Sequence, residues 1–96
     1  MSPDKKKKLH KLRKKLDNLD NKFIKLVKVR TNIVNNVLKL KTYKHEIVDK
    51  KRISKILKNI KDKSIKNKID PKITNQIWKN MIYAYIDYER RNFKKK

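Results

Sequence analysis

Three charged residues occupy positions where a helix would be expected to carry apolar side chains. Apolar residues recur every three or four positions over residues 23–41, and Arg30 and Lys41 fall within this stripe. A similar stripe covers residues 78–93, with Glu89 as its charged member. No position three or four residues from Arg30 holds a carboxylate, so no neighbour on its own helix can neutralise it. The partners of these charges must therefore lie on other elements or on a bound ligand.

The chemistry available to such residues is electrostatic. Burying a charge without a partner is costly, so two cations and a carboxyl group that face inward indicate a polar site inside a helical bundle. Arginine can hold a carboxylate through two parallel hydrogen bonds, and lysine supplies a point charge. Cations placed where negative charge develops can accelerate a reaction without a nucleophile. The pattern favours a site for a small dianion, although Arg30 and Lys41 could instead extend along the apolar surface into solvent and bind nothing specific.

The composition excludes several other kinds of chemistry. The chain has no cysteine and no glycine, which removes thiolate catalysis, most zinc sites and glycine-rich phosphate loops. His10 and His45 lack the spacing of metal ligands, and we expect both at the surface. Asp17 and Asp20 lie close to Arg13 in the helical repeat, which favours surface ion pairs over an acid–base pair. We therefore predict neither a metal nor a cofactor.

The elements that position these residues are all expected to be helices. Three side chains have the type and place of helix N-caps: Ser2, Asp49 and Asp70. The first helix is expected to run to Lys41, and the helical period is then lost over residues 42–48. The second helix fades near Asn67, and the third continues to Phe93. The predicted fold class is all-α, with a long, a short and a medium helix.

The length of the first helix predicts an oligomer. A helix of roughly 36 residues is about 54 Å long, whereas a compact domain of about 100 residues has a radius of gyration of only ~13 Å. The rest of this 96-residue chain cannot cover such a helix. We therefore expect residues 1–96 to form a single domain that pairs with a second copy as an intertwined homodimer.

The chain carries a formal net charge of +22, so nucleic-acid binding is an alternative function. However, 26 of its 31 basic residues are lysines spread over the expected solvent faces, whereas a specific nucleic-acid surface favours arginine. The lysine runs Lys5–Lys8 and Lys94–Lys96 are expected to be solvated ends. The sequence has no cysteine and no long uncharged run, so we expect a soluble cytoplasmic protein.

An ordered set of positions resembles the all-helical chorismate mutase family. The set comprises Leu12–Asp20, Lys41, Asp49–Arg52, Asp70–Pro71 and Ile82–Glu89. In that family, three-helix subunits form an intertwined homodimer with two active sites inside the bundle, and chorismate is converted to prephenate. The resemblance implies the same fold and homodimer, a small dianionic substrate and no cofactor.

The resemblance also implies a role for each matching residue. Arg13 would reach into the partner subunit's site, and Arg30 would bind a substrate carboxylate. Lys41 would contact the ether oxygen and a carboxylate, while Arg52 would help to hold the ring side. Asp49 matches an aspartate that is often found in the loop before the second helix.

The resemblance also leaves the substrate open. Glu89 falls where the family has Gln or Glu that donates a hydrogen bond to the ether oxygen, which a carboxyl group can do only when protonated. Ile53 stands where mutases commonly carry Glu, the acceptor for the substrate's ring hydroxyl. Tyr85 stands where the family usually has Ser or Thr. The loop from Lys41 to Arg52 looks one residue shorter than in some well-known bacterial mutases. These departures resemble the isochorismate-pyruvate lyase branch, although that branch typically has Gln at position 89. Chorismate and isochorismate both remain candidate substrates.

Overall fold

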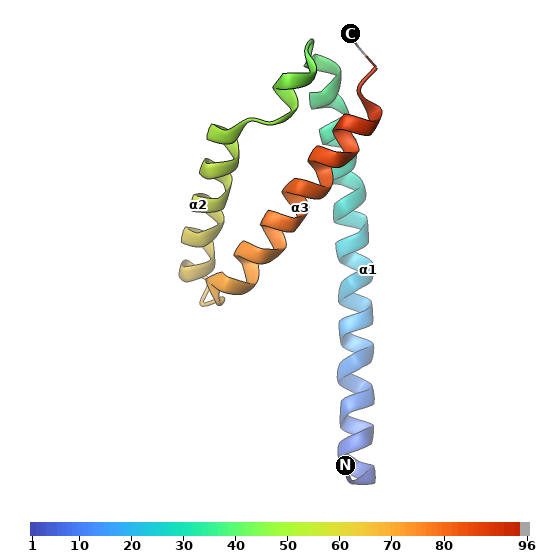
Figure 1. The fold of residues 1–96 in the computed structure, drawn as a ribbon. Helices are drawn as coiled ribbons and strands as arrows, with labels where there is room; N and C mark the ends of the chain where they lie inside the picture. The colour runs from blue at the N-terminus through green and yellow to red at the C-terminus, as the bar shows by residue number, and fades with distance from the viewer. Residues whose placement is uncertain (95–96) are drawn as a thin grey trace. The chain divides into compact units, whose positions relative to one another are not determined.

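The computed structural model describes residues 1–94, and the secondary structure in this range is helical. Its elements are the α-helices α1 (Pro3–Leu40), α2 (Lys50–Lys66) and α3 (Pro71–Asn92) and the short 3-10 helix η1 (Lys44–Ile47) (Figure 1). The predicted all-α fold is confirmed. The loss of period over residues 42–48 did not predict η1, because a single 3-10 turn is too short to show a periodic pattern. Of the expected C-terminal lysine tail, Lys94 is exposed and the last two residues lie outside the described range.

Two of the helices begin at the aspartates that were expected to cap them. Asp49 Oδ1 accepts a hydrogen bond from the backbone N–H of Arg52 at 3.0 Å. Asp70 Oδ1 accepts one from the backbone N–H of Lys72 at 2.9 Å. Each bond satisfies a donor that the first turn of a helix leaves without a partner. These two N-cap predictions are confirmed, and at the start of α1 Ser2 Oγ likewise accepts a hydrogen bond from the backbone N–H of Lys5 at 3.3 Å.

A tight turn joins α2 to α3 and contains a left-handed residue. Lys68 has a φ of 57°, a region that glycine adopts most easily. The backbone N–H of Ile69 donates to the Ser64 carbonyl at 2.8 Å, and that of Lys68 donates to the Ile65 carbonyl at 3.1 Å. These bonds satisfy carbonyls in the last turn of α2. The chain reverses here, so α3 packs against α2 (Figure 1).

The structure divides into two compact units, Met1–Ile33 and the residues from Val34 onward. The boundary falls within α1, which is one continuous helix from Pro3 to Leu40. The single domain expected for residues 1–96 stays a prediction.

The first unit consists of the N-terminal part of α1, and its apolar stripe is exposed. The exposed members include Leu12, Leu16, Leu19, Phe23 and Leu26. Leu16 is 58% exposed and Leu26 is 63% exposed. Because most of the stability of a helix in a protein comes from packing its apolar face, this stripe requires a further surface to cover it.

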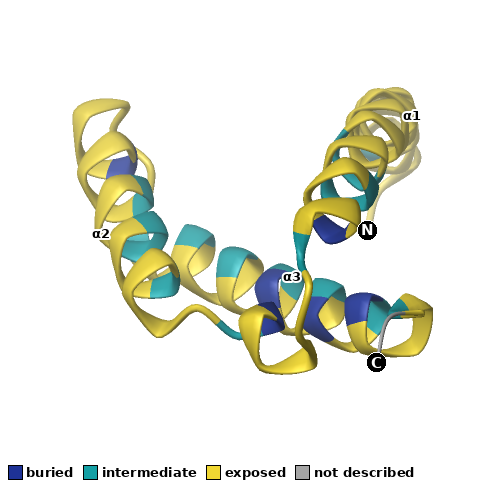
Figure 2. Cartoon of the chain, turned by 90° about the horizontal axis from the view of Figure 1, so that it is seen from above, coloured by how far each residue is buried: buried dark blue, intermediate teal, exposed yellow. Residues whose placement is uncertain are grey.

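The core of the second unit joins the C-terminal end of α1 to η1, α2 and α3. Its buried apolar residues are Leu38, Ile47, Ile82 and Ile86. Half-buried residues of α2 pack against them: Ile53, Ile56 and Leu57. Figure 2 shows buried and half-buried positions recurring along α3. This core brings the end of α1 close to the part of α3 that carries Glu89.

Candidate active site

Lys41 and Glu89 form an ion pair at the centre of the candidate site. Their Nζ and Oε1 atoms are 2.9 Å apart, although the residues lie 48 positions apart in the sequence. Glu89 is 6% exposed, and the side chain of Lys41 is 18% exposed. Lys41 therefore does not extend into solvent. Two of the three charged residues that interrupt apolar stripes are each other's partner, which offsets the cost of burying them.

Core packing fixes the backbone on both sides of this pair. Lys41 directly follows α1, and its backbone N–H donates to the carbonyl of buried Leu38 at 3.1 Å. Glu89 lies on α3 one turn beyond buried Ile86. Because Leu38 and Ile86 belong to the same hydrophobic core, the backbones that carry the ion pair are held at a fixed separation.

The pair can accept an anion without being taken apart. An ammonium group has three N–H donors, and the Lys41 ammonium group uses one of them for its bond to Glu89. A ligand can therefore approach Lys41 while the contact with Glu89 persists. Electrostatic interactions are stronger in such a partly enclosed place than in bulk water, because less solvent screens them.

A hollow of about 620 Å³ opens beside Lys41. It is lined by residues of the loop after α1 and of the first turn of α2: Lys41, Glu46, Val48, Asp49, Lys50 and Lys51. Three lysines in this lining stand against the carboxylates of Glu46 and Asp49, so the lining has a small positive excess.

Glu46 is a site-region residue that the sequence patterns did not identify. Its Oε1 atom accepts hydrogen bonds from the backbone N–H groups of Tyr43 at 2.8 Å and Thr42 at 3.2 Å. Its own N–H donates to the Tyr43 carbonyl at 3.1 Å. The available signal was an acidic residue placed three positions after the start of a turn, as in helix capping boxes. His45, exposed as expected, stacks on the Tyr43 ring with centroids 5.5 Å apart.

The predicted site residues around the start of α2 have local structural roles. Asp49 is exposed and caps α2, and Arg52 is exposed in the first turn. Ile53 is half-buried and packs against the core. An isoleucine at this position thus contributes to the packing of α2 on α3, and it supplies no acceptor for a hydroxyl group.

Tyr85 lies one turn before Glu89 on α3. It is half-buried, and its ring meets that of Tyr88 edge-on with the centroids 6.3 Å apart. An aromatic side chain therefore occupies the place at which the family resemblance gives Ser or Thr.

The two remaining predicted residues, Arg13 and Arg30, belong to the first unit. Arg13 is exposed, whereas Arg30 is half-buried and its Nε atom is shielded from solvent. They lie 17 positions apart on one continuous helix, which corresponds to about 25 Å along the axis. That separation exceeds what one small molecule can span. If both arginines bind the same dianion, they must come from different subunits.

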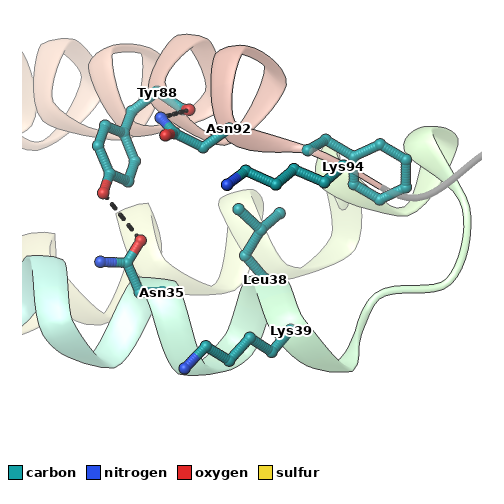
Figure 3. Close-up of a pocket in the computed structure, with 7 residues that line it drawn as sticks. Asn35, Leu38, Lys39, Tyr88, Asn92 and Lys94 are labelled. Carbon is teal, nitrogen blue, oxygen red and sulfur yellow. Dashed lines mark hydrogen bonds between the residues drawn. The ribbon is translucent and has the colours of Figure 1, made fainter.

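A second hollow, of about 410 Å³, lies between the ends of α1 and α3 (Figure 3). Its lining residues are Asn35, Leu38, Lys39, Tyr88, Asn92, Phe93 and Lys94. Tyr88 Oη donates a hydrogen bond to Asn35 Oδ1 at 2.8 Å. Figure 3 shows the Tyr88 hydroxyl pointing at the Asn35 side chain, so a direct tie joins α3 to the last turns of α1.

The described residues contain neither a metal-binding cluster nor a membrane-spanning helix. Over residues 1–94, no group of three or more His, Cys, Asp or Glu side chains is arranged to hold a metal ion. Within the same range, none of the helices combines the length and apolar character needed to cross a membrane. His10, like His45, is exposed.

Comparison with known proteins identifies the family. The family model described as chorismate mutase type II matches residues 12–90, which include every predicted site residue. No curated protein and no solved structure matches the chain. The match spans all three α-helices, and the helical fold is the one that the resemblance implied. The chain therefore belongs to the chorismate mutase type II family.

Proposed function

We propose that this protein is a chorismate mutase that converts chorismate to prephenate by an intramolecular rearrangement, with no cofactor, metal or covalent intermediate. The observation that carries the proposal is the enclosed Lys41–Glu89 pair, which lies at 2.9 Å in a chain of this family. A fixed cation and a carboxyl group on facing elements can stabilise charge on one atom of a bound anion.

In the proposed mechanism, cations hold the dianion in its reactive shape. Arg30 and Arg52 of one subunit, together with Arg13 of the other, bind the two carboxylates and select the conformation in which the reacting carbons meet. Lys41 contacts the ether oxygen, where negative charge develops as the carbon–oxygen bond breaks. These contacts strengthen in the transition state and so lower the barrier.

Glu89 has a second role in this scheme. A carboxyl group can donate a hydrogen bond to the ether oxygen only when protonated. In the structure Glu89 accepts a hydrogen bond from Lys41. We propose that, in its protonated form, it donates instead to the ether oxygen of the bound substrate.

A homodimer completes the proposed site. The exposed apolar stripe of α1 supports a second copy as the covering surface. The separation of Arg13 from Arg30 along α1 supports the supply of Arg13 from the partner subunit. Two active sites per dimer follow from this arrangement.

The proposal is tested by incubating the purified protein with chorismate and following its loss together with the appearance of prephenate. Lys41→Ala is expected to lower kcat/KM by about 10²-fold or more, the usual effect of removing an electrostatic donor. Lys58→Ala, which removes an exposed lysine of α2, is the charge-matched control and should retain activity. Wild-type protein that forms no prephenate, or a fully active Lys41→Ala variant, would contradict the proposal.

Ile53 favours a second candidate function, an isochorismate-pyruvate lyase that binds the two substrate carboxylates with the same arginines. Isochorismate carries its hydroxyl elsewhere on the ring, so an acceptor at position 53 is not required. Incubation of separate samples with each substrate distinguishes the two, because the lyase reaction releases pyruvate and fluorescent salicylate. Ile53→Glu should then raise turnover of chorismate relative to isochorismate if residue 53 decides between them.

A further inference from the structure

We propose that Glu46 is a positioning residue that holds the backbone immediately after Lys41 and thereby aims the Lys41 ammonium group at the substrate. The inference rests on the proposed catalytic role of Lys41, and it adds a residue for which the family resemblance implied no role.

The first observation is where the Glu46 carboxylate binds. It accepts hydrogen bonds from the backbone N–H groups of Thr42 and Tyr43, the two residues that follow Lys41. Hydrogen bonds to an ionised acceptor are stronger than those between neutral groups. Two such bonds to one oxygen restrict the backbone torsions where the chain leaves α1, and so fix the direction in which the Lys41 side chain starts from the backbone.

The second observation is what holds Glu46. The neighbouring residue, Ile47, is 4% exposed and belongs to the same core cluster as Ile82 and Ile86 of α3. A continuous series of contacts therefore leads from α3, which carries Glu89, through η1 to the residues after Lys41. In this way the position of the Lys41 ammonium group depends on α3, the helix that carries Glu89.

The third observation is the charge of the surrounding loop. From Lys41 to Lys51, Glu46 and Asp49 are the acidic residues among several lysines, and Asp49 is engaged as the cap of α2. Glu46 lines the same hollow as Lys41. Its engagement with two backbone donors keeps its carboxylate in the loop, where it braces the chain without replacing Glu89 as the partner of Lys41.

The experiment compares Glu46→Ala, Glu46→Gln and a control, Asp62→Ala, which removes an exposed carboxylate of α2 and changes the net charge equally. A small misplacement of a catalytic group can cost up to about a hundredfold in rate. We expect Glu46→Ala to lower kcat about tenfold with a smaller change in KM. Glu46→Gln keeps a side-chain oxygen that can accept the same bonds and should restore most of the rate. A purely stabilising role would lower the melting temperature of Glu46→Ala without changing kcat of the folded protein.

A measurement that does not depend on activity separates this inference from the proposed function. Site-resolved acylation, read by peptide mass spectrometry, reports how often the Lys41 amine leaves its partner and meets reagent. Glu46→Ala should raise the modification rate of Lys41 several-fold relative to Lys58 in the same chain, whereas Glu46→Gln and Asp62→Ala should not. An unchanged Lys41 rate in folded Glu46→Ala overturns the positioning role, whether or not the wild-type protein forms prephenate. A raised Lys41 modification rate in Glu46→Ala, together with a wild-type protein that lacks mutase activity, would support the positioning role of Glu46 and reject the proposed reaction.

Discussion

Tyr88 and Asn35 are joined by a hydrogen bond of 2.8 Å that connects α3 to the last turns of α1. Tyr88 immediately precedes Glu89, and Asn35 lies six residues before Lys41. The bond therefore holds together the same two helix ends that carry the ion pair. Both side chains are half-buried, so when this bond is lost, water can form only part of the hydrogen bonding that it provided.

Replacing Tyr88 with Phe should destabilise the second unit without removing any charge. The substitution leaves Asn35 Oδ1 without the phenol donor, and the expected cost is about 1 kcal/mol of unfolding free energy. Urea unfolding followed by circular dichroism measures it. Tyr83→Phe, at an exposed tyrosine of the same helix, is the control. Equal unfolding midpoints for the two variants would show that the bond does not contribute.

Replacing Glu89 with Ala should be more damaging, because it leaves the ammonium group of Lys41 partly enclosed without its carboxylate. Breaking a buried pair from one side typically costs about 3–5 kcal/mol, and the partial exposure of Lys41 reduces the expectation to about 2 kcal/mol. Asp87→Ala removes the carboxylate of another 2.9 Å pair on the same helix, where the side chains are 65% and 69% exposed. That control should lose about 0.5 kcal/mol or less. Similar losses from the two variants would contradict the enclosed character of the Lys41–Glu89 pair.

The pH dependence of turnover should reveal whether Glu89 is a hydrogen-bond donor. Only the protonated form of a carboxyl group donates, so a donor role for Glu89 requires kcat to fall as the pH rises. Glu89→Gln keeps an N–H donor at every pH and should flatten this dependence. The check is a pair of kcat profiles recorded over the pH range in which both proteins stay folded. A mutant profile that still falls like that of the wild type would assign the titration to another group.

Covering of the α1 stripe by a second copy is expected to be sensitive to a charge placed in it. Leu16→Asp should shift the protein toward the monomer and abolish activity, since Arg13 could then no longer reach the partner's site. Asn18→Asp makes the same change of charge on an exposed residue outside the stripe. Analytical ultracentrifugation gives the mass of each. A Leu16→Asp variant with the same mass and activity as the wild type would rule out this dimer.

The parts of the fold that depend on neighbouring residues were predictable from the sequence. The caps at Asp49 and Asp70 were predictable because the bonded backbone groups lie within three residues. The inward direction of Glu89 was also predictable, because its position in an apolar stripe fixes the face of the helix on which it lies. That Lys41 is its partner could not be derived from either stripe alone, since the contact depends on how the two helices pack.

Glu46 shows why part of the site was missed. Its bonds depend on the backbone path between α1 and α2, and a turn of so few residues has no periodicity to reveal that path. Ile53 illustrates a different difficulty. The sequence marks it as a missing hydrogen-bond acceptor, while the structure shows it contributing to the core, and a single residue type is compatible with both.

The contact between Lys41 and Glu89 also bears on which acids the proposed site would select. Because Glu89 already places one negative charge beside the lysine, a monovalent acid would gain little there, whereas a dianion would bring a second charge for the proposed arginine contacts.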